Sequence, residues 1–98
     1  MPKPRRTRKK ASLEEDLAFS WPDAAAPWEG KIVVKHKRHS DSFIELSVGV
    51  GVTRWRAVSR GVCCIARGMI GNLKEDRERA KSQIEQEWLI AMMARGWT

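Results

Sequence analysis

Residues 43–52 read FIELSVGVGV, and this stretch decides the fold. Isoleucine, leucine and valine occupy the even positions, while phenylalanine, glutamate, serine and two glycines occupy the odd ones. This alternation is typical of a strand that buries one of its faces. The two glycines allow either a bulge within one long strand or a tight turn near Val50, and we favour the turn.

Further strands are predicted on both sides of this stretch. On its N-terminal side, a β-branched run at 32–34 precedes a polar hairpin loop and predicts a strand over about 31–37. On its C-terminal side, two arginines alternate with threonine, tryptophan and alanine over 52–58. A hairpin loop at 59–61, with a glycine available for a positive φ, then leads to a fourth strand over 62–69. The sequence therefore predicts an antiparallel sheet of three or four strands.

A short helix is predicted before the sheet. Residues 12–15, SLEE, form a capping-box pattern, which is typical of a helix start. The apolar residues Leu13, Leu17 and Trp21 are spaced four residues apart, so they would share one helical face. Because Pro22 blocks continuation, the helix should cover about 13–20 and give way to a Pro- and Ala-rich connector.

A long helix is predicted after the sheet. Asn72 can cap its start, with Glu75 at the third helical position. Its end is predicted at 95–97, where Gly96 can adopt the left-handed conformation of a Schellman-like cap. The apolar residues that recur at helical spacing, and that should lie on the sheet, are Leu73, Ala80, Ile84, Trp88, Ala91 and Met92.

The predicted fold is α+β: a three- to four-stranded antiparallel sheet with one long C-terminal helix packed on one face, a short N-terminal helix and a disordered basic arm. We divide the chain into a flexible basic arm at 1–11, the short helix and its connector at 12–30, and the sheet with its long helix at 31–98. Ninety-eight residues suffice for one small domain and exclude a large enzyme core.

The chain has neither an apolar run long enough to span a membrane nor an apolar segment after its basic N-terminus. We therefore expect a cytoplasmic protein without a membrane partner. Cys63 and Cys64 are adjacent and could form only a strained disulfide, so a reducing compartment fits.

Charge is the strongest functional signal in the sequence. The 19 Lys and Arg residues outnumber the 12 Asp and Glu residues and give a net charge of +7, which favours a polyanionic partner. A basic arm follows phosphates whatever the base sequence, although it could also serve as a solubilising or localisation tail. Other cations lie on the predicted strands and hairpin loops. Alternation places the cations of the strands on the sheet face that the long helix leaves open. These cations could bind nucleic acid, or they could only keep that face soluble. The predicted nucleic-acid-binding residues are Lys3, Arg5, Arg6, Arg8, Lys9, Lys10, Lys35, Lys37, Arg38, Arg54, Arg56 and Arg60.

Other candidate sites receive less support. Trp55 stands between two arginines, and we favour a core position over a base-stacking role. Histidines 36 and 39 and the two cysteines are metal-ligand types, but consecutive strand cysteines point to opposite faces, so no metal site is expected. No residue pattern marks a Cys-His nucleophile or a phosphate-binding glycine loop. We therefore expect no catalytic residue, no cofactor and no enzymatic activity.

The order of basic arm, hairpin sheet and closing helix resembles the small N-terminal DNA-binding domain of phage tyrosine integrases. The features that carry the resemblance are Arg5-Arg6-Thr7-Arg8, the strands around 44–48, 55–58 and 62–69, and the helix from Leu73. They cover about two-thirds of the chain. The predicted helix before the sheet and the missing catalytic domain depart from that pattern. The resemblance therefore implies a stand-alone accessory protein of a phage or mobile element.

Our first hypothesis is a small non-enzymatic protein that binds DNA or RNA through its basic arm and sheet face. The alternative is a phage-encoded, anti-CRISPR-like inhibitor that binds an acidic or nucleic-acid-binding surface of a host defence complex. A third possibility is a small structural subunit whose arm enters an RNA-rich assembly. The oligomeric state stays open.

Overall fold

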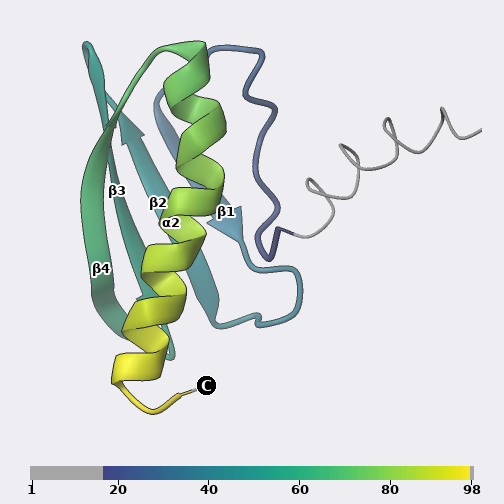
Figure 1. Cartoon of the computed structure of the whole chain (residues 1–98), viewed down its shortest axis with the longest axis vertical. Helices are drawn as coiled ribbons and strands as arrows, with labels where there is room; N and C mark the ends of the chain where they lie inside the picture. The colour runs from purple at the N-terminus through teal and green to yellow at the C-terminus, as the bar shows by residue number, and fades with distance from the viewer. Residues whose placement is uncertain (1–16, 98) are drawn as a thin grey trace, which may run out of the picture.

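The chain forms a four-stranded antiparallel meander followed by one helix in the computed structural model, which describes residues 17–97 (Figure 1). Each strand pairs with the next one in the chain, so the order in the sheet is β1-β2-β3-β4. This arrangement confirms the predicted α+β class. The elements are β1 (Lys31–Lys35), β2 (Ser42–Val48), β3 (Val52–Ser59), β4 (Val62–Gly71) and α2 (Lys74–Ala94).

The two tight turns of the meander depend on residues with positive φ. At the β2–β3 turn Gly51 has φ 77°, which confirms the turn that we favoured over a long bulged strand. At the β3–β4 turn both Arg60 and Gly61 have positive φ, at 51° and 76°. Two successive positive φ values are typical of the two-residue hairpins whose twist matches that of the strands.

The start of α2 differs from the prediction by one residue. Leu73 is the N-cap, and its backbone N–H donates to the Asp76 carboxylate at 3.3 Å. Asn72 does not cap the helix: its side-chain amide donates to the Gly49 carbonyl at 2.7 Å, and its side-chain oxygen accepts from the Thr53 hydroxyl. The predicted core position of Leu73 is therefore wrong, since its side chain is 64% exposed.

The end of α2 confirms the predicted cap. Gly96 has φ 74°, and its N–H donates to the Met93 carbonyl at 3.0 Å. The Trp97 N–H donates to the Met92 carbonyl at 2.9 Å. This pair of bonds is the Schellman pattern, which satisfies carbonyls that the helix leaves without partners.

The core lies on one side of the sheet, which we call the covered face. The helix lies across this face, and residues 17–30, here called the strap, run beside it on the same side (Figure 1). The Trp88 indole N–H donates to the Ser59 hydroxyl at 2.9 Å, and that hydroxyl is 2.7 Å from the Ser42 hydroxyl. The buried core residues are Phe19, Trp28, Val34, Ile44, Leu46, Trp55, Ala57, Ile70, Ala80, Ile84, Trp88 and Met92.

The strap replaces the predicted short helix over its described part. Residues 17–20 are not helical: Ala18 lies in a bend, and Phe19 forms an isolated antiparallel bridge with His36. Residues 13–16 lie outside the described part of the chain. The Glu85 carboxylate of α2 accepts the backbone N–H groups of Ala18 and Phe19 at 2.8 and 2.9 Å and the Trp21 indole N–H at 2.7 Å. The two backbone N–H groups are donors that a helix would have used, and all three bonds hold the strap against α2.

The first strand is shorter than predicted. β1 ends at Lys35, and the chain then turns because the His36 Nδ1 accepts the backbone N–H groups of Arg38 and His39 at 2.9 and 3.0 Å. Beyond the end of β1, the Lys37 backbone N–H donates to the Ala18 carbonyl of the strap at 2.9 Å. In residues 17–97, no helix is both long and apolar enough to cross a membrane.

Candidate functional site

The second side of the sheet, here called the open face, faces away from both α2 and the strap. The strand register places most of its side chains in three cross-strand rows. We call the first row the cation row and the second the paired row; the third ends at the β4 bulge. The cation row is Lys31, Ser47, Arg54 and Met69; the paired row is Val33, Glu45, Arg56 and Arg67; the third row is Lys35, Phe43 and Val58.

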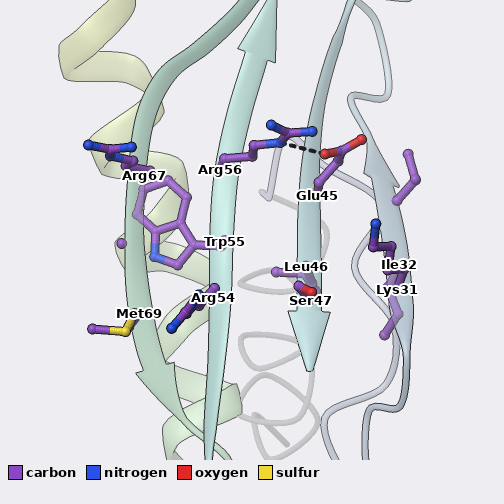
Figure 2. A pocket seen from close by; sticks show the side chains of 12 residues that line it. Lys31, Ile32, Glu45, Leu46, Ser47, Arg54, Trp55, Arg56, Arg67 and Met69 are labelled. Atoms are coloured by element: carbon purple, nitrogen blue, oxygen red, sulfur yellow. Dashed lines mark hydrogen bonds and ion pairs between the residues drawn. The ribbon is translucent and has the colours of Figure 1, made fainter. Parts of the chain in front are cut away.

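The cation and paired rows line a groove of about 660 Å³ that crosses all four strands (Figure 2). Its exposed cations come from three strands, with Lys31 at one edge, Arg54 and Arg56 in the middle and Arg67 at the other edge. Glu45 is the one carboxylate that the described residues contribute to the groove. The groove therefore carries a clear excess of positive charge, which attracts anions.

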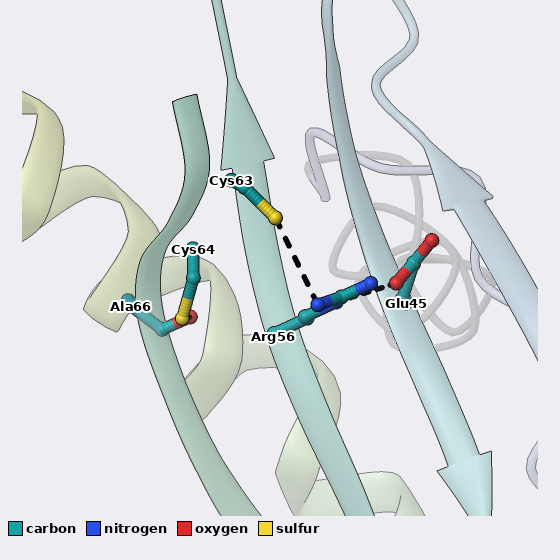
Figure 3. Close-up of polar contacts among 5 residues, drawn as sticks. All are labelled: Glu45, Arg56, Cys63, Cys64 and Ala66. Carbon is teal, nitrogen blue, oxygen red and sulfur yellow. Dashed lines mark hydrogen bonds and ion pairs between the residues drawn. The ribbon is translucent and has the colours of Figure 1, made fainter. Parts of the chain in front are cut away.

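The carboxylate that Glu45 contributes to the groove is already bound. Glu45 accepts a hydrogen bond from the Arg56 Nε, and this bond raises the pKa of Arg56 above its ordinary value (Figure 3). The Arg56 Nη1 also lies 3.8 Å from the Cys63 sulfur. Arg67 stands directly opposite Arg56, and like charges in such a position destabilise a sheet. The Glu45 contact offsets that repulsion, so the paired row is partly neutralised.

Three of the predicted binding residues lie on the open face. Arg54 and Arg56 line the groove, in the positions that alternation predicts. Lys35 is exposed in the third row, beside Phe43. Arg54 belongs to the cation row, and it has no hydrogen-bond or ion-pair partner within residues 17–97.

Three other predicted residues lie at one end of the sheet rather than in the groove. Lys37 and Arg38 belong to the β1–β2 loop, because β1 ends before them. Arg60 belongs to the β3–β4 turn, and its guanidinium carbon lies 4.9 Å from the centre of the Trp97 ring. The Arg60 N–H donates to the Asp41 carbonyl at 3.1 Å, which joins the two loops. The predicted domain cations thus form two groups, one on the open face and one at this end of the sheet.

The prediction missed two cations of the groove, Lys31 and Arg67. Lys31 has the same strand parity as Lys35, so the pattern that selected one could have selected the other. Arg67 was harder to place, because β4 contains an irregularity opposite Val58 and Cys64 has φ 81°, which interrupts alternation counted from the strand start. The remaining predicted residues lie outside the described part of the chain: Lys3, Arg5, Arg6, Arg8, Lys9 and Lys10.

The aromatic side chain of Trp55 belongs to the core, although this residue is also among those that line the groove (Figure 2). Trp55 is only 6% exposed and belongs to the core cluster, which agrees with the position that we favoured. Gly68 lies directly opposite it on β4, where a Cβ atom would be 2.8 Å from the Trp55 Nε1. The glycine therefore makes room for the indole on the covered face. Phe43 of the third row is half-buried.

The histidines and cysteines do not converge on one point. The His36 ring lies against Phe19 and Trp88, at centroid distances of 4.8 and 5.1 Å, whereas Cys63 contacts Arg56 on the open face. Within residues 17–97, no group of three or more His, Cys, Asp or Glu side chains could hold a metal ion.

Comparison with protein families, with curated proteins and with solved structures finds no match for this chain. Its function is therefore argued from the residues of the groove and of the basic segments.

Proposed function

We propose that this chain is a non-enzymatic nucleic-acid-binding protein that uses the groove of the open face and its basic N-terminal segment. The observation that carries the proposal is the excess of cations in the groove, whose one described carboxylate is held by Arg56. Cations that neutralise phosphates release condensed counterions, and this release drives sequence-independent binding. An exposed sheet face with this charge supports a phosphate-bearing ligand.

The position of the strap supports a role for the N-terminal segment. Ala18 is bonded to Lys37, so the chain preceding it joins the domain at the end that carries Lys37, Arg38 and Arg60. The first ten residues include six cations, and they are connected to this end by only a few residues. The segment could thus add phosphate contacts next to those of the domain.

A second candidate function has its own observation. Met69 is 64% exposed and Val33 is 52% exposed, and both lie in the groove among the cations. A surface that mixes apolar and cationic side chains also suits an acidic protein surface. This observation favours the protein-binding inhibitor as the alternative proposal.

The decisive experiment is a fluorescence-anisotropy titration of the full chain with duplex DNA, single-stranded DNA and RNA over a range of salt concentrations. We expect a dissociation constant of about 1 μM or tighter for at least one probe at physiological salt, which is the tight end of non-specific binding. Removal of residues 1–10 should weaken binding and flatten the salt dependence while the fold stays intact.

A charge-reversed pair tests the groove. Arg54→Glu with Arg67→Glu should abolish tight binding for every probe, because it reverses two groove cations without breaking the Arg56–Glu45 pair. The matched control is Lys74→Glu with Arg79→Glu on α2, which changes the net charge by the same amount away from the groove. If the parent binds no probe at physiological salt, the proposal fails and the inhibitor becomes the better one. Equal losses for both pairs would show that overall charge, not the groove, drives binding.

A further inference from the structure

The two rows of the groove differ in their chemistry. In the cation row, Lys31, Ser47 and Arg54 stand side by side on three adjacent strands (Figure 2). In the paired row, Glu45 takes the place next to Arg56. Directly opposed side chains on neighbouring strands have Cβ atoms about 5 Å apart, so both cations of the cation row are close to the serine between them.

The side chains of the cation row are free to bind a ligand. All three are exposed, and none has a hydrogen-bond or ion-pair partner among residues 17–97. Glu45, the one carboxylate that the described residues contribute to the groove, is bound to Arg56 and so is not available to neutralise Lys31 or Arg54. The row therefore combines two uncompensated positive charges with a hydroxyl donor between them.

These donors match the requirements of a phosphate group. An arginine offers several N–H groups in a planar fork, a lysine offers a compact positive charge, and a serine hydroxyl donates one hydrogen bond. Contacts of this kind to phosphate oxygens fix the position of a nucleic acid but do not read its bases. The paired row is less suitable, because its carboxylate would repel a phosphate placed above it.

We propose that Lys31, Ser47 and Arg54 form a subsite for one backbone phosphate of the bound nucleic acid. The Ser47 hydroxyl donates to a phosphate oxygen, and the two cations contact the same group from either side. This inference rests on the proposed function and sharpens it, since it assigns positioning contacts to one row of the groove. It also assigns a role to Lys31 and Ser47, which charge patterning in the sequence did not select.

The test compares single substitutions in the full chain by anisotropy titration with a duplex and a single-stranded probe. Lys31→Gln and Arg54→Gln should each weaken binding about tenfold, equally for unrelated base sequences, and lower the salt slope by about 1. Ser47→Ala should weaken binding about threefold to tenfold without changing the salt slope, because it removes a donor but no charge. Ser47→Thr, which keeps the hydroxyl, should restore most of the affinity.

The matched control is Lys74→Gln on α2, which removes one positive charge from an exposed position outside the groove. It should leave both the affinity for unrelated sequences and the salt slope near the parent values. Thermal denaturation of each variant checks that the fold is retained.

A second measurement uses inorganic phosphate with the full chain, followed by amide chemical shifts. The shifts should concentrate at residues 31, 47 and 54 and disappear in the Arg54→Gln variant. If the parent binds nucleic acid but the row variants keep its affinity and salt slope, the subsite is wrong while the proposed function stands. If phosphate perturbs the row but no nucleic acid binds, the ligand is another phosphate compound and the proposed function fails. Absence of both signals overturns the subsite and the proposed function together.

Discussion

The two faces of the sheet are built from the same strands but carry opposite chemistry. On the covered face, Ile44 and Leu46 of β2 are almost fully buried under α2 and the strap. On the open face, the alternate residues of the same strand are Glu45 and Ser47, which line the groove. Neighbouring residues in the sequence therefore have different tasks. Substitutions on the covered face should therefore change stability, whereas substitutions on the open face should change the proposed binding of nucleic acid.

The largest expected effect is the loss of Trp88 from the covered face. Trp88→Ala should lower the free energy of unfolding by about 3–5 kcal/mol, because it leaves a cavity under α2 and removes the donor to Ser59. Denaturant unfolding measures the change. Leu89→Ala, at the next and exposed position, is the matched control and should change stability by less than about 0.5 kcal/mol. Similar losses for the two variants would contradict the assigned helix face.

Gly68→Ala tests how tightly the covered face is filled. The added methyl group would lie 2.8 Å from the Trp55 Nε1 and 3.0 Å from two carbons of its ring. Because Trp55 is buried, the clash should cost about 1–3 kcal/mol of unfolding free energy. Met69→Ala, one position further on the open face, should cost much less. If the clash with Trp55 is the cause, Gly68→Ala should lower the free energy of unfolding by less in a Trp55→Leu background.

Acidification should lower the free energy of unfolding through His36, whose ring lies against Phe19 and Trp88 of the core. Burial, aided by the charge of His39, lowers the pKa of His36 below its ordinary value of 6.5. A lowered histidine pKa means that the folded state binds fewer protons than the unfolded state, so the contribution of His36 to stability falls as the pH drops below about 6.5 and is constant above it. Denaturant unfolding between pH 5.5 and 7.5 should show this loss.

His36→Asn provides the check on that pH dependence. An asparagine oxygen can accept the N–H groups that the His36 Nδ1 now accepts, but it does not titrate. The variant should lose this part of the pH dependence, whereas His39→Asn should keep most of it. A pH profile that is the same in the parent and in His36→Asn would assign the effect to another group.

The smallest expected effect on stability is on the open face. Arg54→Gln should change the free energy of unfolding by less than about 0.5 kcal/mol, because the side chain is exposed and has no partner within residues 17–97. Thermal and denaturant unfolding of the purified variant measure it. A destabilisation comparable to that of Gly68→Ala would mean that the two faces are not independent.

Local sequence patterns were sufficient to predict the sheet and its long helix. The alternation in residues 43–48 assigned both faces of β2, and helical spacing placed Ala80, Ile84, Trp88 and Met92 in the core. Turn chemistry identified the hairpins, since Gly51 and Gly61 adopt the positive φ that the sequence allowed. These features depend on residues close together in the chain, and short patterns report them well.

Long-range contacts explain what the sequence could not predict. Residues 17–20 of the strap were expected to be helical, but Glu85 binds the backbone N–H groups of Ala18 and Phe19 from 67 and 66 residues away. A related limit applies to the candidate site: Arg54 and Arg56 were found by alternation, whereas Arg67 follows an irregularity of β4 that interrupts the alternation. The resemblance to integrase domains stays a prediction.

The strand order β1-β2-β3-β4 has a consequence for the folding rate. Each strand pair is closed by a loop of two to six residues, whereas the strap reaches Glu85 across 67 residues. Closing the longer loop costs roughly 2 kcal/mol more in chain entropy, since each doubling of loop length adds about 0.6 kcal/mol. The hairpins can therefore form before the strap docks on Glu85, and the contacts between the strap and Glu85 should be absent from the transition state. Glu85→Gln should accordingly speed unfolding and leave the refolding rate almost unchanged.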